Sequence, residues 1–272
     1  MLFDSHVHLN NDDYTQAQRD ELAAAIEASD VSFVCDVGFN LEGSALAVKH
    51  AERYPWCYAA VGYHPHEARH MGELELKLIE GLAKKPKVKA IGEMGLDFHY
   101  DHSPRDAQRD CFRKQIRLAN KLKMPIVVHS READQEVMAI LKEEQAFSDE
   151  RIGWFPRKAG GGPDARVLLH CFSGSREIAE QYVKLGAIIS IAGPVTYPKA
   201  RKLVEVCEAI AIGELLIETD APYLTPEPYR GKRNRSPYVE FTARKIAEIK
   251  GMSYEDVAAI TCENAKRFYG IE

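Results

Sequence analysis

The sequence has no apolar run long enough to cross a membrane. One of its longest apolar stretches, AIISIAGPV at 187–195, falls well short of the roughly 18 residues that a spanning helix needs. A charged segment followed by an apolar one is also missing from the start of the chain, which argues against a secretory signal. We therefore expect a protein without a membrane partner.

Cysteine pairs are missing as well. The six cysteines are Cys35, Cys57, Cys111, Cys171, Cys207 and Cys262. They are scattered, none belongs to a Cys-x-x-Cys motif, and most lie within apolar stretches. This pattern is typical of reduced core residues, so it argues against a disulfide framework and favours a cytoplasmic location.

A strong net charge is the third absence. The chain has 36 Lys and Arg residues against 41 Asp and Glu residues, which gives a formal net charge of −5 at pH 7. This balance provides no general attraction to nucleic acid or to acidic membranes. Any polyanionic partner must therefore be held by local positive features.

What the sequence does contain is an alternation of short β-rich runs with longer segments of helical period. The runs cover residues 2–8, 31–38, 57–64, 88–93, 125–129, 166–171, 187–193 and 214–220. Near-continuous Val, Ile and Leu predict strands buried on both faces, and the intervening segments are long enough for right-handed helical crossovers. Eight such strands predict an α/β fold, with one (β/α)₈ TIM barrel over 1–272 as a single domain. A doubly wound open sheet is the alternative.

Local signals place two helices and one irregular segment. Ser103 and Pro104 predict a capped start for a helix over 105–122, and Ser253 similarly opens the C-terminal helix. The segment 147–164 lacks periodicity and contains three consecutive glycines at 160–162. We expect this segment to form an elongated, mobile surface loop.

Ionisable residues gather at the C-terminal ends of most predicted strands, where a barrel of this class builds its active site. They are His6, His8, His64, Glu93, His129, His170 and Asp220. His6 and His8 are two residues apart on one strand, so both can face the barrel mouth as a chelating pair. An isolated histidine is more often a hydrogen-bonded core or loop residue, but a joint set of imidazoles and carboxylates in one cavity favours metal binding.

The ligand types restrict the metal without identifying it. Imidazoles and carboxylates without thiolates suit Zn²⁺, Mn²⁺, Fe²⁺ or Mg²⁺. The set without His64 offers more ligands than the roughly three that a mononuclear catalytic zinc site uses. The sequence therefore predicts two divalent metal ions per chain that share a bridging carboxylate, and Glu93 is the predicted bridge.

Seven sequence blocks occur in a fixed order along nearly the whole chain. They are DSHVHL at 4–9, VGYHPHEA at 61–68, IGEMGLDF at 91–98, PIVVHSREA at 125–133, LHCFSG at 169–174, ETDAPYLTP at 218–226 and PYRGKRN at 228–234. In this combination they resemble the TatD family of metal-dependent deoxyribonucleases. The resemblance implies an amidohydrolase-like (β/α)₈ hydrolase that cleaves DNA phosphodiester bonds as a 3′–5′ exonuclease.

The resemblance also implies roles for the ionisable residues. It groups His6, His8, Glu93 and Asp220 around one metal, and Glu93, His129 and His170 around the second. Asp220 matches the family position that can accept a proton from the attacking water, so it is the expected general base.

Two further positions match family sites near the substrate phosphate. His64 could donate to a non-bridging oxygen or to the leaving group, and its alternative role is to cap a loop. Arg131 follows His129 by two residues, and its guanidinium suits two phosphate oxygens, with a surface ion pair as the alternative.

A basic stretch follows the last predicted strand and is the local positive feature required above. Arg230, Lys232 and Arg233 would bring positive charge to the barrel mouth, unless they form a solvated loop. Tyr223 and Tyr229 flank the stretch and could stack on bases or pack the loop. The expected partner is single-stranded DNA or DNA ends, with RNA as an alternative.

Two other functions stay open at this point. One is a hydrolase of the same superfamily that acts on a small phosphoester, ester or amide, because barrels reuse metal centres for many reactions. The other is a metal-binding scaffold without turnover. Arg131 and the basic stretch favour phosphate, whereas an interaction insensitive to chelators would favour the scaffold.

Overall fold

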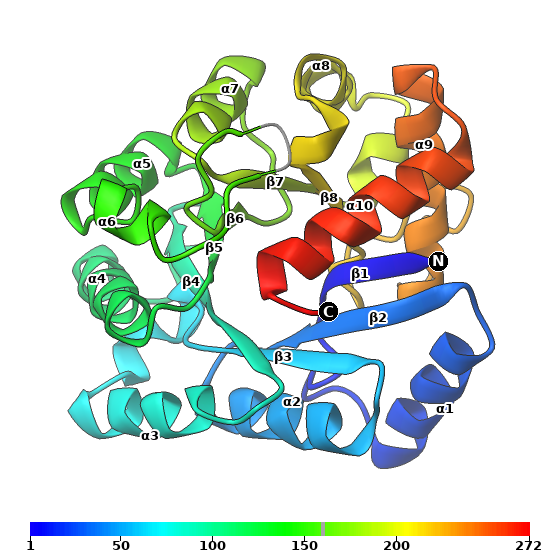
Figure 1. Ribbon diagram of the computed structural model, residues 1–272. Helices are drawn as coiled ribbons and strands as arrows, with labels where there is room; N and C mark the ends of the chain where they lie inside the picture. The colour runs from blue at the N-terminus through cyan, green and yellow to red at the C-terminus, as the bar shows by residue number, and fades with distance from the viewer. Residues whose placement is uncertain (159–160) are drawn as a thin grey trace.

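The computed structural model describes residues 1–158 and 161–272, and within them eight parallel strands follow one another around a barrel (Figure 1). The strands are β1 Leu2–Val7, β2 Val31–Val37, β3 Cys57–Val61, β4 Val88–Asp97, β5 Ile126–Arg131, β6 Val167–Leu169, β7 Ile188–Ile191 and β8 Leu215–Ile217. A parallel bridge between Val7 and Ala221 joins β1 to the segment that follows β8. The predicted barrel is therefore confirmed, and the alternative of an open sheet is excluded.

Helices surround the barrel and bury their apolar sides against the strands (Figure 1). They are α1 Gln16–Glu27, α2 Leu41–Arg53, α3 Glu73–Ala83, α4 Arg105–Leu122, α5 Asp134–Glu143, α6 Asp149–Ile152, α7 Arg176–Lys184, α8 Arg201–Ala209, α9 Val239–Lys250 and α10 Tyr254–Tyr269. Short 3₁₀ helices are η1 Pro65–His70, η2 Gly193–Thr196, η3 Ile212–Glu214 and η4 Ser236–Tyr238. None of these described helices is both long enough and apolar enough to span a membrane.

An apolar layer fills the interior of the barrel at one end. Each strand contributes to a single buried cluster that contains Phe3, Cys35, Ala60, Ala90, Val127, Leu168, Ile188 and Leu216. The end of α10 closes this cluster with Phe268 and Tyr269, and the Tyr269 hydroxyl donates to the Ser5 carbonyl at 2.7 Å. α10 thus covers this end of the barrel, and the polar residues that lie further along the strands gather at the opposite, C-terminal end.

Several strand ends differ from their predicted positions, and the ends of β3 and β4 shift in opposite directions that bear on His64 and Asp97. β4 continues to Asp97 and so passes beyond Glu93, whereas β3 stops at Val61 and leaves His64 in the following turn. There His64 is the N-cap residue of η1. The longer β4 brings a second carboxylate, that of Asp97, into the same region of the barrel.

The predicted helix starts have different outcomes. Ser253 caps α10 by accepting the Asp256 N–H at 3.1 Å, as expected. The predicted Ser103 cap is wrong, because Pro104 occupies the N-cap position of α4. The Ser103 hydroxyl instead donates to the His66 carbonyl at 2.6 Å, and this contact ties α4 to η1.

The expected surface loop at 147–164 is also corrected. The segment contains α6, which begins after the Ser148 cap, and the side chain of Arg151 is fully buried. Lys158 is also buried and donates to the Ala187 carbonyl at 3.1 Å. Charged side chains with buried partners therefore hold the segment onto the barrel; Gly160 of the glycine run lies outside the described residues.

Candidate metal centre

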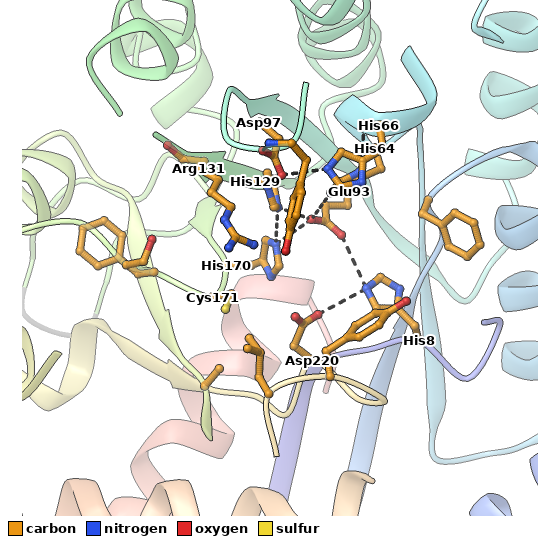
Figure 2. A pocket seen from close by; sticks show the side chains of 18 of the residues that line it. His8, His64, His66, Glu93, Asp97, His129, Arg131, His170, Cys171 and Asp220 are labelled. Carbon is orange, nitrogen blue, oxygen red and sulfur yellow. Dashed lines mark hydrogen bonds and ion pairs between the residues drawn. The ribbon is translucent and has the colours of Figure 1, made fainter. Parts of the chain in front are cut away.

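The inward-facing register of the strands carries ionisable side chains to the mouth of the barrel. Val127 in the apolar layer is followed two residues later by His129, and Leu168 by His170. Because alternate residues along an extended strand share a face, each imidazole points to the barrel interior, as does the apolar residue two positions before it. Figure 2 shows these histidines converging with Glu93 and Asp220. The pattern of an apolar interior followed by a polar mouth therefore builds the site.

Glu93 lies at the centre of this convergence. Its Oε2 is 3.3 Å from His6 Nε2 and 3.7 Å from His8 Nε2. Its Oε1 is 2.8 Å from His129 Nδ1 and 2.7 Å from His170 Nε2. The two oxygens of one carboxylate thus face two different groups of imidazoles.

The local backbone of β4 allows this placement. The register between β4 and β5 shifts between Ile91 and Met94, and Gly92 has φ of +147°. A Cβ at Gly92 would lie 2.6 Å from the Val127 carbonyl oxygen. Only glycine accommodates both the positive φ and the close approach of β5, so it fixes how Glu93 enters the barrel.

His6 and His8 form the pair that their spacing predicts. Their Nε2 atoms are 3.2 Å apart, and His8 Nδ1 donates to the Val37 carbonyl at 2.8 Å. In a neutral His8 ring the proton on Nδ1 leaves a lone pair on Nε2, directed at the same point as His6 Nε2. A cation between these nitrogens would relieve the repulsion of their lone pairs, so the donor set fits a metal ion.

Asp220 completes this side of the site. Its Oδ1 lies 3.4 Å from His8 Nε2 and 3.8 Å from His6 Nε2. Burial alone would raise the pKa of Asp220, but the nearby imidazoles hold it below its usual range. Neighbouring imidazoles, led by His170, likewise hold the pKa of buried Glu93 well below its usual range. Both carboxylates are therefore anionic, as metal ligands must be.

Close groups of possible ligands recur in this region. Three groups have ligand atoms within 4.8 Å of one another: His6 with His8 and Glu93, His6 with His170 and Glu218, and His64 with Glu93 and His129. The first of these groups belongs to the predicted first ligand set, whereas the other two combine predicted ligands with Glu218 and with His64. Metal identity is not set by these contacts, because imidazole and carboxylate donors suit several divalent ions.

His64 caps a 3₁₀ helix and also faces the centre. Its Nδ1 accepts the backbone N–H of His66 at 3.1 Å, which caps η1. Its Nε2 lies 3.4 Å from Glu93 Oε1. Burial lowers the pKa of His64 to about 4 despite the nearby carboxylate, so the ring is neutral and carries its proton on Nε2. This nitrogen is a hydrogen-bond donor that faces the centre.

Arg131, the last residue of β5, lines the cavity (Figure 2). Its guanidinium carbon lies 4.6 Å from the ring centroid of Tyr100. Within the described part of the chain, no carboxylate forms an ion pair with Arg131. An aromatic ring thus supports the guanidinium and leaves its N–H groups free for an anion.

The three basic residues after β8 occupy a different place. Arg230, Lys232 and Arg233 are exposed, and among the described residues they stand outside the lining of the cavity. The guanidinium of Arg230 lies over Tyr197 at 4.2 Å, and that of Arg233 over Tyr14 at 4.6 Å. They can therefore meet only a ligand that extends beyond the cavity.

The two tyrosines near this loop differ in whether their rings can contact a ligand. Tyr223 lines the cavity with a half-exposed side chain, and its hydroxyl accepts from the Asn11 amide at 2.9 Å. Tyr229 instead stacks on Tyr238 with ring centroids 4.4 Å apart and an interplanar angle of 3°. Only the first of these two rings is thus presented to a ligand in the cavity, which has a volume of about 880 Å³.

Sequence reasoning missed three ionisable residues in this region, namely Asp97, Glu218 and His66. Asp97 Oδ2 lies 2.8 Å from His66 Nε2 and 3.3 Å from His129 Nε2. Glu218 Oε1 lies 3.4 Å from His170 Nδ1. The signal was present, because Asp97 follows Glu93 by four residues and Glu218 precedes Asp220 by two, an even spacing that can place side chains on one face of a strand.

A closed (β/α)₈ barrel with imidazoles and carboxylates gathered at its mouth has the architecture of an amidohydrolase-like hydrolase. A family model described as TatD related DNase matches residues 3–270. The chain therefore belongs to the TatD family of metal-dependent hydrolases.

Individual relatives agree with this assignment. The chain is 44% identical over 271 residues, with 100% of both chains covered, to a Bacillus subtilis protein named uncharacterized metal-dependent hydrolase YabD. It is 33% identical over 275 residues to the Citrobacter rodentium protein named 3′-5′ ssDNA/RNA exonuclease TatD, covering 99% of this chain and 98% of the relative. The crystal structure of YJJV, a TatD homolog from Escherichia coli K12, superposes with a TM-score of 0.86 at 26% identity, covering 100% and 98% of the two chains.

Proposed function

We propose that this protein is a two-metal phosphodiesterase that removes nucleotides from the 3′ end of single-stranded DNA. The observation that carries the proposal is the position of Glu93, whose two carboxylate oxygens face two separate imidazole groups. A carboxylate in this position can bridge two ions, and paired ions suit displacement at phosphorus. The exonuclease name of the Citrobacter rodentium relative supports the choice of nucleic acid and of polarity.

Each ion would be held by its own set of residues. The first would be held by His6, His8 and Asp220, the second by His129 and His170, and Glu93 would belong to both. Bound at these positions, divalent ions would neutralise phosphate charge and make water more acidic. Zn²⁺, Mn²⁺, Mg²⁺ and Fe²⁺ are all compatible with these ligands.

Asp220 is the proposed general base. It lies beside both His6 and His8 at the mouth of the barrel and is held in its anionic form. The carboxylate would accept the proton of the attacking water while remaining close to the first ion. Its side chain is still partly accessible at 13%, whereas that of Glu93 is 3% exposed, so Asp220 is better placed to meet a water from the cavity.

His64 and Arg131 would bind the phosphate. His64 is neutral and donates through Nε2, which fits a hydrogen bond to a non-bridging oxygen better than transfer of a proton to the leaving group. The guanidinium of Arg131 can pair with two oxygens of the same group or of its neighbour. Tyr223 would stack on a base, and Arg230, Lys232 and Arg233 would attract the strand beyond the cavity.

The test measures bound metal and hydrolysis of 3′-labelled single-stranded DNA on one preparation, with Mg²⁺ or Mn²⁺ added. Glu93→Ala should lose most of the bound metal and most of the activity together. Glu180→Ala is the matched control, because Glu180 forms an exposed ion pair with Arg176 on α7 and should behave as the wild type.

Each component of the proposal can fail separately. Wild-type protein that binds two ions but leaves oligonucleotides intact would overturn the substrate, and RNA, small phosphoesters, esters and amides would be tested next. Undiminished hydrolysis by Glu93→Ala would overturn the bridging role.

A further inference from the structure

We infer that Asp97 is a positioning residue that orients His129 so that its Nδ1 faces the second metal position. This inference rests on the two-ion proposal above. Asp97 lies near the end of β4, it is 1% exposed, and it follows Glu93 on the strand that reaches further than its sequence predicts. The assigned ligands do not include it.

Both carboxylate oxygens of Asp97 already have donors. Oδ1 accepts the backbone N–H of His99 at 3.0 Å and of Tyr100 at 2.9 Å. Oδ2 accepts from His66 Nε2 at 2.8 Å and from His129 Nε2 at 3.3 Å. With donors on each oxygen, Asp97 is suited to hold its neighbours in place rather than to bind an ion itself.

The geometry of His129 shows how its contact with Asp97 orients the imidazole ring. Its two ring nitrogens face different carboxylates, Nε2 toward Asp97 and Nδ1 toward Glu93 at 2.8 Å. Nδ1 also lies 3.4 Å from His170 Nε2, so it is the nitrogen directed at the shared centre. A proton fixed on Nε2 by Asp97 leaves the lone pair on Nδ1, which is the form that can bind a cation.

The Asp97 backbone is itself held firmly. The amide of Gln108 on α4 accepts the Asp97 N–H at 2.8 Å and donates to the Asp97 carbonyl at 3.2 Å. Gln108 is fully buried, and it also donates to the Ser103 carbonyl at 2.9 Å. A helix outside the barrel thus fixes the position of the carboxylate, and through it the ring of His129.

The test is a Mn²⁺ titration of the metal-free full-length protein, followed by electron paramagnetic resonance of the loaded sample. The wild type should bind two ions and give the spectrum of a coupled pair. Asp97→Asn can no longer enforce the proton on Nε2, because an amide can donate as well as accept. We expect its second ion to bind about 10–100-fold more weakly, with the spectrum of isolated Mn²⁺ at one equivalent.

Two control variants separate this effect from a general loss of structure. Asp164→Asn changes another buried carboxylate, which pairs with Arg267 away from the centre, and should leave both ions bound. His66→Ala removes the second histidine from Asp97 while keeping the contact with His129, so it should also retain two ions. If only the Asp97→Asn variant loses the second ion, the contact between Asp97 and His129 is the cause of that loss.

Failure of the Asp97 role and failure of the two-ion proposal would give different results. A wild type that binds a single ion would overturn the two-ion proposal, whereas a variant Asp97→Asn with two ions at wild-type affinity would overturn the role of Asp97. If that variant does not fold, ¹⁵N-histidine NMR of the Zn²⁺-loaded wild type decides the question. The proton of His129 should reside on Nε2, and a proton on Nδ1 would refute the inference.

Discussion

Asp220 and His8 come from opposite ends of the chain, yet Asp220 Oδ1 lies 3.4 Å from His8 Nε2. Backbone hydrogen bonds at the seam of the barrel hold them there: the His8 N–H donates to the Ala221 carbonyl at 2.9 Å, and the Asp220 N–H donates to the His6 carbonyl at 2.9 Å. Closure of the barrel therefore assembles this half of the centre. The same contact gives the first prediction.

Asp220→Asn should lower kcat for oligonucleotide hydrolysis by roughly 10²–10⁴-fold, because an amide cannot accept the proton of the attacking water. The substitution is nearly isosteric, so the circular dichroism spectrum and the thermal unfolding midpoint should stay close to those of the wild type. Single-turnover hydrolysis at saturating Mn²⁺ measures the effect. An unchanged rate would remove Asp220 from the role of general base.

His64 gives a prediction that depends on which atom donates. His64→Ala should reduce kcat by about 10²-fold or more, because it removes a donor that faces the phosphate position. His64→Gln retains an N–H group and should recover part of the loss. A comparison of kcat for the two variants at saturating DNA checks this order. Equal losses would argue against a hydrogen bond from Nε2.

Tyr223 and Tyr229 form a matched pair for base stacking. Tyr223→Ala should weaken binding of single-stranded DNA by about 1–3 kcal/mol, the range of one stacked base. Tyr229→Ala should leave DNA affinity nearly unchanged, because the Tyr229 ring stacks on Tyr238. Fluorescence anisotropy with a labelled oligonucleotide, in Ca²⁺ to suppress hydrolysis, measures both affinities. The reverse order would assign the stacking surface to the basic loop.

Arg151 gives a prediction about stability rather than activity. Its guanidinium is buried and donates to the Ala165 carbonyl at 2.9 Å, the Asn120 amide oxygen at 2.6 Å and the Met124 carbonyl at 2.8 Å. Arg151→Ala leaves these acceptors without a partner and should lower the free energy of unfolding by about 3 kcal/mol or more.

The control for this experiment lies in the same segment. Arg157 is exposed, and Arg157→Ala should change the free energy of unfolding by less than about 0.5 kcal/mol. Urea unfolding followed by tryptophan fluorescence compares the two variants. Similar small effects in both would restore the interpretation of 147–164 as a loose surface loop.

Much of the fold could be predicted because a parallel barrel has a strong local signature. Each strand is buried on both faces, so its apolar run is visible without knowledge of its neighbours. The starts of β1, β2, β3 and β4 match their predicted positions, whereas the end of β4 extends four residues beyond its predicted boundary. That extension depends on pairing with β5, where Asp97 lies opposite Arg131, and no local pattern reports it.

In the segment 147–164, local sequence patterns do not predict the structure. Its lack of periodicity correctly indicates that residues 147–158 and 161–164 form no long helix, but it gives no information about Arg151 or Lys158. The partners of these residues lie on other elements, among them the Asn120 amide on α4 and the Glu214 carboxylate in η3. Ser103 fails as a helix cap for a similar reason, since a carbonyl in η1 competes for its hydroxyl.

The sequence by itself determined the strand and helix alternation, most of the imidazoles and carboxylates that gather at the mouth of the barrel, and the family. These depend on residue type and short-range spacing, which the chain carries locally. Only the tertiary structure decided which oxygen of Glu93 faces which imidazoles, that Tyr223 is available while Tyr229 is packed, and that Asp97 stands behind His129. Those relations depend on distances of a few ångströms between strands and loops far apart in the sequence, and closure of the barrel sets them.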